Sequence, residues 1–191
     1  FENNIYKPTT PYAASRVTAD HFLNLLYSQK KINYSSVRAS NVYGEYQRLY
    51  RIVPKTIFSI LKNKKINLHG GGISKRNFIH IDDVSSPTFK VMTSGKSGEC
   101  YHISGNSMIS IRSLVKKICK KMNYNFKSLV KFSNERKGKD KTYILSSKKI
   151  QTQLKWKQKI TLDKGLARCI EWLKKNVNSF NNKDLEYKHK K

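Results

Sequence analysis

The sequence predicts a globular α/β fold, because amphipathic helical segments alternate with short, β-rich segments along most of its length. Apolar residues recur with the spacing of one helix face over residues 12–29, 51–62, 111–122 and 162–176. The length points the same way, since 191 residues, 38% of them hydrophobic, can bury a substantial core in one domain or a domain and a half.

The first part of the chain predicts a loop, one long helix and a short strand. Residues 1–11 contain two prolines, which disfavour regular structure. A strand is expected over residues 32–39, and it ends in a polar turn over residues 40–44. The helix over residues 12–29 carries the apolar residues Val17, Phe22, Leu23, Leu25, Leu26 and Tyr27.

The middle of the chain continues the alternation. Pro54 falls in the first turn of the helix over residues 51–62, where its missing N–H costs little. Asp82 is expected to cap a helix over residues 83–94, in which Pro87 is acceptable only within the first turn. Short strands are expected over residues 66–69, 77–81, 99–104, 129–132 and 141–145.

The last two long helices have clear N-terminal signals. Ser110 and Thr161 are good N-caps for the helices over residues 111–122 and 162–176. The tail over residues 178–191 is polar, and we expect it to fray.

The charge of the chain is its most unusual property. Thirty-nine Lys and Arg residues against 12 Asp and Glu residues give a net charge of +27. Such a field attracts polyanions and nucleotides. The lysines are scattered over nearly every segment, however, and charge alone is only the first sign of nucleic-acid binding. Nucleic acid is therefore the less favoured partner.

Other simple classes are disfavoured. No run of about 18 apolar residues occurs, so no membrane helix is expected, and the first residues do not resemble a signal peptide. Cys100, Cys119 and Cys169 have no metal-ligand spacing and are expected to be reduced thiols in a cytoplasmic protein, the last two in the core. The histidines also lack ligand spacing, so no metal site is predicted.

The start of the first helix carries the chemistry. Tyr12 and Arg16 are four residues apart and therefore share one helix face. A phenol beside a fixed cation has a lowered pKa, because the cation favours its anion. The pair therefore predicts a general base that could take a proton from a sugar hydroxyl, although an ordinary exposed Tyr and Arg would show the same spacing.

Six segments form an ordered set of motifs. They are PYAASR at 11–16, RASNVYG at 38–44, HGGG and RNFIHIDDV between 69 and 84, YHISG at 101–105, RKGKD at 136–140 and LKWK at 154–157. In this order they resemble the motifs of the extended short-chain dehydrogenase/reductase family, also called the NAD-dependent epimerase/dehydratase family. Within it, the chain looks most like nucleotide-sugar 4,6-dehydratases of the dTDP-glucose type. Nearly the whole chain takes part.

The resemblance implies a partial NAD(P)-binding Rossmann fold, made of its C-terminal strands and helices, plus a small α/β substrate-binding domain. Residues 1–61 and 78–94 would belong to the Rossmann part. Residues 62–77 and 95–177 would form the nucleotide-sugar-binding domain, and residues 178–191 the tail.

The resemblance also implies a reaction, that of a lyase using NAD. Tyr12 would remove the hydroxyl proton at C4 of the sugar as hydride leaves that carbon for NAD. Arg16 stands where the family has a lysine that holds the nicotinamide ribose, and this exchange is not conservative at a tight site. A nucleotide-sugar 4-epimerase or a UDP-glucuronate decarboxylase of the same family, or a non-catalytic basic nucleotide- or nucleic-acid-binding protein, are the alternatives.

The family's binding residues map onto two sets. The cofactor set comprises Tyr12, Arg16, Arg38, Ala39 and Ser40. The substrate set comprises Asn41, Arg51, Arg76, Arg136 and Lys139. Three arginines from separated segments would grip one diphosphate, a task that suits their forked donors.

The family's Gly-rich cofactor turn, catalytic Thr and acidic pair would lie before Phe1, and none of them occurs in these 191 residues. We therefore expect the sequence to be the C-terminal three-fifths of such an enzyme, inactive alone. The family also implies a homodimer through helices that include the Tyr12 helix.

Overall fold

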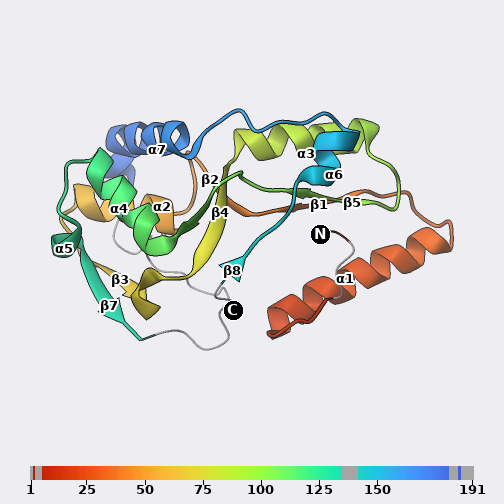
Figure 1. Cartoon of the computed structure of the whole chain (residues 1–191), viewed down its shortest axis with the longest axis horizontal. Coiled ribbons are helices and arrows are strands. Elements are labelled where there is room, and N and C mark those ends of the chain that lie inside the picture. The colour runs from red at the N-terminus through yellow and green to blue at the C-terminus, as the bar shows by residue number, and fades with distance from the viewer. Residues whose placement is uncertain (1, 3–5, 135–141, 181–184, 186–191) are drawn as a thin grey trace.

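The chain is built from short parallel strand pairs with helices on either side (Figure 1). The computed structural model describes residues 2, 6–134, 142–180 and 185. The helices are α1 (Pro11–Ser28), α2 (Ile52–Leu61), α3 (Asp82–Ser94), α4 (Ile111–Lys121), α5 (Phe126–Leu129), α6 (Lys148–Gln153) and α7 (Leu162–Asn176), with 3-10 turns η1 (Gly70–Gly72) and η2 (Val177–Ser179). The strands are β1 (Ser36–Ala39), β2 (Asn41–Tyr43), β3 (Ile66–His69), β4 (Lys75–His80), β5 (Cys100–Ile103), β6 (Met108–Ser110), β7 (Val130–Ser133) and β8 (Thr142–Tyr143).

Parallel pairing dominates the sheets. β1 pairs with β5, β2 with β4, and β3 with β7, all in parallel. β4 continues past β2 to pair with β6 in antiparallel and with β8 in parallel orientation. The carboxyl half of β4 therefore pairs with β2, and its amino half pairs with β6 and β8, so β4 links these strands into one sheet (Figure 1).

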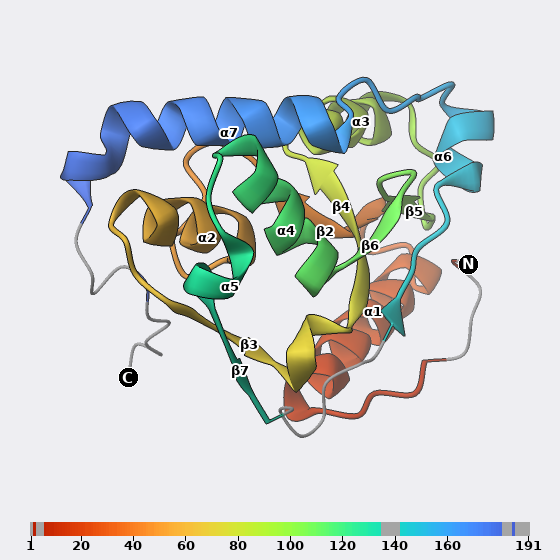
Figure 2. The ribbon, with the colours of Figure 1, turned by 60° about the vertical axis from the view of Figure 1, so that its left-hand side comes forward.

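Two hydrophobic cores support these strands. The first core lies among α2, α4, α7 and β3, and α7 runs across α2 and α4 (Figure 2). The second core lies between the strands and helices α3 and α6, and consists of Ile79, Val91, Tyr101, Ile103, Ile150 and Trp156. The predicted domains grouped α2 with β1 and separated β5 from it. In the packing, α2 belongs to the first core, and β5 pairs with β1 beside the second core. The division into domains stays a prediction.

The amphipathic helices form as the sequence predicts. The hydroxyls of Ser110 and Thr161 accept hydrogen bonds from the backbone N–H of Ser113 (3.0 Å) and Lys164 (3.3 Å), which caps α4 and α7. Along α7, buried Leu166, Ile170 and Leu173 follow the spacing of one helix face. Cys119 and Cys169 are buried free thiols, as predicted, and Cys100 is half-buried.

Some local predictions were wrong. The expected polar turn over residues 40–44 contains strand β2, and β6 was not predicted. Pro87 lies inside α3 instead of in its first turn, and it is buried. Ile81, not Asp82, is the N-cap of α3. Tertiary packing decided these positions, since intrinsic propensity is only a weak guide for short segments.

Helix α1 differs from the other long helices because none of its residues is buried. Thr10 caps it, and its Asp20 pairs with Arg38 of β1 at 2.6 Å. Val17, Leu23 and Leu26 of the predicted apolar set are half-buried, whereas Phe22 and Leu25 are 59% and 50% exposed and are left uncovered by the described residues. Figure 1 shows α1 on its own side of the β1–β5 pair. No helix in the described part of the chain is long and apolar enough to cross a membrane.

Leu166→Ala should lower the free energy of unfolding by about 2–5 kcal/mol, because Leu166 is fully buried in the first core. Leu25→Ala is the matched control, since Leu25 lies in a helix but is 50% exposed, and we expect a change of about 0.5 kcal/mol or less. Urea denaturation followed by circular dichroism measures both. Losses of equal size in the two variants would contradict this placement of the core.

Candidate functional site

The carboxyl ends of β1 and β5 form a polar edge. The backbone N–H of Ser40, directly after β1, donates to the carbonyl of Ile103 at 2.9 Å. Ser40 is 5% exposed, and its hydroxyl has no hydrogen-bond partner among the described residues. Buried polar groups normally find a partner, and ligands of α/β folds bind where parallel strands end. Ser40 is therefore placed to meet a ligand.

Asparagine side chains hold the neighbouring strands together at this edge. The amide of Asn41 donates to the carbonyl of Asn77 at 3.3 Å, and the amide of Asn77 donates to the carbonyl of Gly105 at 2.6 Å. The side-chain oxygen of Asn77 is buried without a partner in the described chain. This oxygen is a second buried acceptor, and Asn77 was not among the predicted site residues although it lies inside a recognised motif.

Tyr12 and Arg16 lie one turn apart on α1, as their spacing predicts. Tyr12 is 76% exposed and Arg16 is also exposed. Within the described chain their side chains form no hydrogen bond or ion pair with each other. Among the described residues no element covers Tyr12, so the contact between its phenol and the Arg16 guanidinium stays a prediction.

The other predicted cofactor residues lie in and after β1. Arg38 is half-buried, forms the ion pair with Asp20, and stacks on Tyr6 with its guanidinium carbon 4.9 Å from the ring centre. Ala39 is the last residue of β1. Arg38 therefore ties α1 to β1 at Asp20.

The predicted diphosphate residues are only partly described. Arg51 is the exposed N-cap of α2, with its guanidinium carbon 5.4 Å from the centre of the Tyr50 ring. Arg76 is half-buried on β4 and donates to the carbonyl of Lys75 at 2.7 Å. Arg136 and Lys139 lie outside the described residues. The convergence of three arginines on one ligand therefore stays a prediction.

A cavity of about 580 Å³ lies between α2 and β3. It is lined by cationic Lys55, Lys64 and Lys65, by His69, and by Ser59, whose buried hydroxyl has no partner in the described chain. Its other lining residues are Tyr50, Ile52, Ile66, Asn67, Leu68, Gly72, Ile111 and Leu185. The volume is in the range of small-molecule sites, and its lysines would favour an anion.

Sequence reasoning did not single out this cavity, although two of its signals were visible. Tyr50 and Ile52 flank the predicted Arg51, and His69 begins the HGGG motif. The glycine turn needs its glycines, because Gly70, Gly71 and Gly72 have φ angles of 54°, 64° and 68°. Arg112 fixes the turn by donating from Nε to the carbonyl of Gly71 at 2.7 Å.

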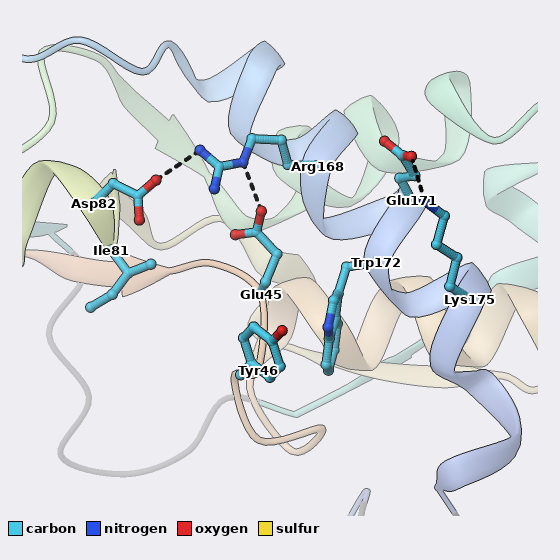
Figure 3. A pocket seen from close by; sticks show the side chains of 8 residues that line it. All are labelled: Glu45, Tyr46, Ile81, Asp82, Arg168, Glu171, Trp172 and Lys175. Atoms are coloured by element: carbon cyan, nitrogen blue, oxygen red, sulfur yellow. Dashed lines mark hydrogen bonds and ion pairs between the residues drawn. The ribbon is translucent and has the colours of Figure 1, made fainter.

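A second cavity, of about 480 Å³, lies beside α7 (Figure 3). Arg168 bridges two carboxylates there, at 2.7 Å from Glu45 and 2.8 Å from Asp82. The Tyr46 and Trp172 rings lie next to each other with centroids 4.9 Å apart. Ile81, Glu171 and Lys175 complete the lining. No residue of this cavity was predicted as a site, and the expected capping role of Asp82 is replaced by its ion pair with Arg168.

Buried groups lie under this second cavity. His80 is fully buried, and its Nε2 lies 3.0 Å from a carboxylate oxygen of Glu45. Burial would raise the pKa of Glu45, but hydrogen bonds from its own backbone and from Arg168 hold that pKa below its ordinary value. Burial, followed by the nearby Glu45, raises the pKa of the Cys169 thiol to about 12.

Comparison with known proteins identifies relatives over almost the entire chain. The family model described as GDP-mannose 4,6-dehydratase matches residues 1–169. A dTDP-D-glucose 4,6-dehydratase of Mus musculus is 33% identical over 186 residues, covering 95% of this chain and 52% of the relative. A dTDP-glucose 4,6-dehydratase of Haemophilus influenzae is 29% identical, covering 93% and 56%. The chain thus spans about half the length of the curated relatives it matches.

Solved structures agree with these matches. A dTDP-glucose 4,6-dehydratase of Streptomyces venezuelae with NAD and TYD bound has a TM-score of 0.89 at 28% identity, covering 94% of this chain and 55% of that chain. The dTDP-glucose 4,6-dehydratase of Bacillus anthracis in complex with NAD has a TM-score of 0.90 at 27% identity, covering 97% and 58%.

The comparisons confirm the resemblance drawn from the six motifs and the predicted partial Rossmann α/β fold. The match over residues 1–169 includes α1, the strand-end edge and most residues that line the two cavities. The lining residues beyond it are Glu171, Trp172, Lys175 and Leu185. The chain therefore belongs to the GDP-mannose 4,6-dehydratase family, within the extended short-chain dehydrogenases/reductases.

Proposed function

We propose that this chain forms the C-terminal part of an NAD-dependent nucleotide-sugar 4,6-dehydratase of the dTDP-glucose type. The observation that carries the proposal is its likeness over 95% of its length to dTDP-glucose 4,6-dehydratases. The lysine-lined cavity beside Arg51 supports it, because a nucleoside diphosphate is an anion of suitable size. The activity would belong to a protein of the relatives' length.

The residues at the carboxyl end of β1 fit NAD. The buried hydroxyl of Ser40 lacks a partner in the described chain and lies where ligands of such folds bind. The cofactor would lie beside Arg38, Ala39 and Ser40. Tyr12 and Arg16 would approach it from α1. NAD, when bound, supplies the acceptor for a hydride from the sugar.

Proton transfer would fall to Tyr12. Its phenolic oxygen would take the proton of the sugar C4 hydroxyl, and Arg16 would favour the phenolate from one turn away. A guanidinium is longer and flatter than the ammonium usual at this position, so it would hold the phenol at a different angle. The reaction also needs a cover over α1, since Tyr12 is 76% exposed.

Substrate binding would use cations from separate elements. Arg51 at the start of α2 and Arg76 on β4 would hold the diphosphate. Arg136 and Lys139, which lie outside the described residues, are the other two predicted contacts of the diphosphate. The amide of Asn41, now on the carbonyl of Asn77, would lie near the phosphates at the strand-end edge. An epimerase or a decarboxylase of the same family would use the same groups, so product analysis separates these reactions.

We expect dTDP to bind the cavity between α2 and β3, and Arg51→Ala to weaken binding by about tenfold or more, because a charge-assisted hydrogen bond is lost. Arg48→Ala, an exposed arginine three residues away, is the matched control and should change affinity little. Isothermal titration calorimetry at two salt concentrations measures both. The contrary outcome is that both variants weaken dTDP binding equally and that DNA or RNA binds more tightly than dTDP, in a salt-dependent way. This result would instead support the non-catalytic basic binding protein.

We expect the 191-residue chain alone to show no saturable NAD binding in the micromolar range. The sequence contains no Gly-rich cofactor turn, and the face carrying Tyr12 and Arg16 is open. Quenching of intrinsic fluorescence by NAD, with dTDP as a positive control for folded protein, measures this. Micromolar NAD affinity would refute the expectation.

A homodimer through α1 is also part of the proposal, because Phe22 and Leu25 leave an apolar face open to solvent. Phe22→Asp should shift the chain toward monomer, because the charge would be buried in the contact. Sedimentation velocity at several concentrations measures the state, with Thr152→Asp, an exposed threonine on α6, as control. A wild-type chain that is monomeric at every concentration would contradict the dimer.

A further inference from the structure

Three different donor groups converge under the second cavity. Glu45 follows β2, His80 ends β4, and Cys169 lies in α7. One carboxylate oxygen, one imidazole nitrogen and the sulfur all lie within 4.8 Å of one another. His80 is 0% and Cys169 is 3% exposed, and Glu45 is half-buried. The donors therefore face one another and not solvent.

Close helix packing produces this convergence. At Gly165, one turn before Cys169, an added Cβ would lie 2.2 Å from the Tyr43 hydroxyl oxygen and 2.9 Å from Cδ2 of His80. Only glycine lets α7 approach β2 and β4 this closely. The sulfur of Cys169 reaches the imidazole for that reason.

The donor set matches the preferences of zinc. Zn²⁺ takes thiolate, imidazole and carboxylate ligands at about 2.0–2.3 Å, so its donors lie roughly 3–4 Å apart. The Glu45 oxygen and His80 Nε2 are already 3.0 Å apart. Small side-chain rotations would bring all three donors around one ion. The cavity beside Glu45 would supply a water as the fourth ligand.

The surroundings also fit a metal site. Asp82 places a carboxylate oxygen 3.7 Å from Nδ1 of His80, behind the imidazole as seen from Glu45. In metal sites the imidazole nitrogen that is not a ligand usually donates to such a carboxylate. Arg168 holds both Asp82 and Glu45 in position (Figure 3). The chain has only 12 acidic residues against 39 basic ones, yet two of the acidic residues, Glu45 and Asp82, lie beside His80.

The simpler interpretation is a hydrogen-bonded brace. The backbone N–H of Asp82 donates to Nδ1 of His80 at 3.3 Å, so Nε2 carries the proton and donates to Glu45. In this state Cys169 only fills space. Metal binding would move the imidazole proton to Nδ1, where Asp82 accepts it, and would release the thiol proton to solvent. The two interpretations therefore predict different roles for the sulfur.

We propose that Glu45, His80 and Cys169 bind one Zn²⁺ in a site that joins β2, β4 and α7 and leaves its fourth position to water. The site is separate from the proposed cofactor and nucleotide sites and does not depend on them. Ligand spacing in the sequence gave no sign of it, since each donor comes from a different element.

Cobalt titration of the full 191-residue chain tests the proposal. We expect one equivalent of Co²⁺ to give a thiolate-to-cobalt charge-transfer band and Zn²⁺ to displace it. Cys169→Ser should abolish the band, and Cys119→Ser, which removes another buried thiol far along α4, should retain it. Absence of the band in the folded wild-type chain, or its persistence in Cys169→Ser, would overturn the proposal.

A second pair of variants keeps the test decisive if Cys169→Ser fails to fold. Glu45→Gln removes the partly exposed ligand and should weaken Zn²⁺ binding by more than the ~10–100-fold typical of lost outer-shell partners. Glu171→Gln removes another carboxylate of the same cavity and should leave affinity unchanged. Zinc affinity comes from competition with a chromogenic chelator. Equal affinities for the two variants would refute the ligand assignment.

Discussion

The buried carboxylate of Asp83 holds the two cores together. Asp83 is 3% exposed, and its oxygens accept hydrogen bonds from the backbone N–H groups of Lys159 (2.9 Å) and Ile160 (2.7 Å). Asp83 is the second residue of α3, which packs on the second core, and residues 159–160 lead into α7 of the first core. A buried charge is tolerated only when it is fully hydrogen-bonded. This contact therefore helps to position the start of α7, the helix that supplies Arg168, Glu171, Trp172 and Lys175 to the cavity of Figure 3.

Sequence patterns predicted the parts of the fold that depend on local chemistry. The caps Ser110 and Thr161 and the apolar stripe of α7 are correct, because a hydroxyl at a helix start and a 3.6-residue period act within a few residues. Strand β2 and the roles of Asp82 and Asp83 were missed. Their partners lie in β4 and near α7, and no local signal announces contacts so distant in the chain.

The residues of the candidate sites also fall into two groups: those predicted from a local motif and those brought together only by packing. Ser40 and Asn41 were predicted because they stand inside a recognisable motif, and the fold places Ser40 directly after β1 and Asn41 at the start of β2. Their roles stay a prediction. Ser59 and the Glu45–His80–Cys169 cluster were missed, since their environment is created by the packing of α2 on β3 and of α7 on β4. Motifs thus identified the family. Clusters made by the packing of distant segments required coordinates.

Helix α1 shows why the proposed chemistry needs more than correct spacing. Isolated helices are marginal in water, and this one buries no side chain. Its Thr10 cap, the Arg38–Asp20 ion pair and the edge-to-face contact of Tyr27 with Tyr34 hold it against the strands. A phenol that is 76% exposed is solvated by water, and water screens any charge beside it. An apolar partner over the exposed Phe22 and Leu25 would stabilise the helix by burying them. It would not by itself shield Tyr12, which lies more than two turns earlier and on another face of α1, so the proposed chemistry needs a cover at the start of the helix as well.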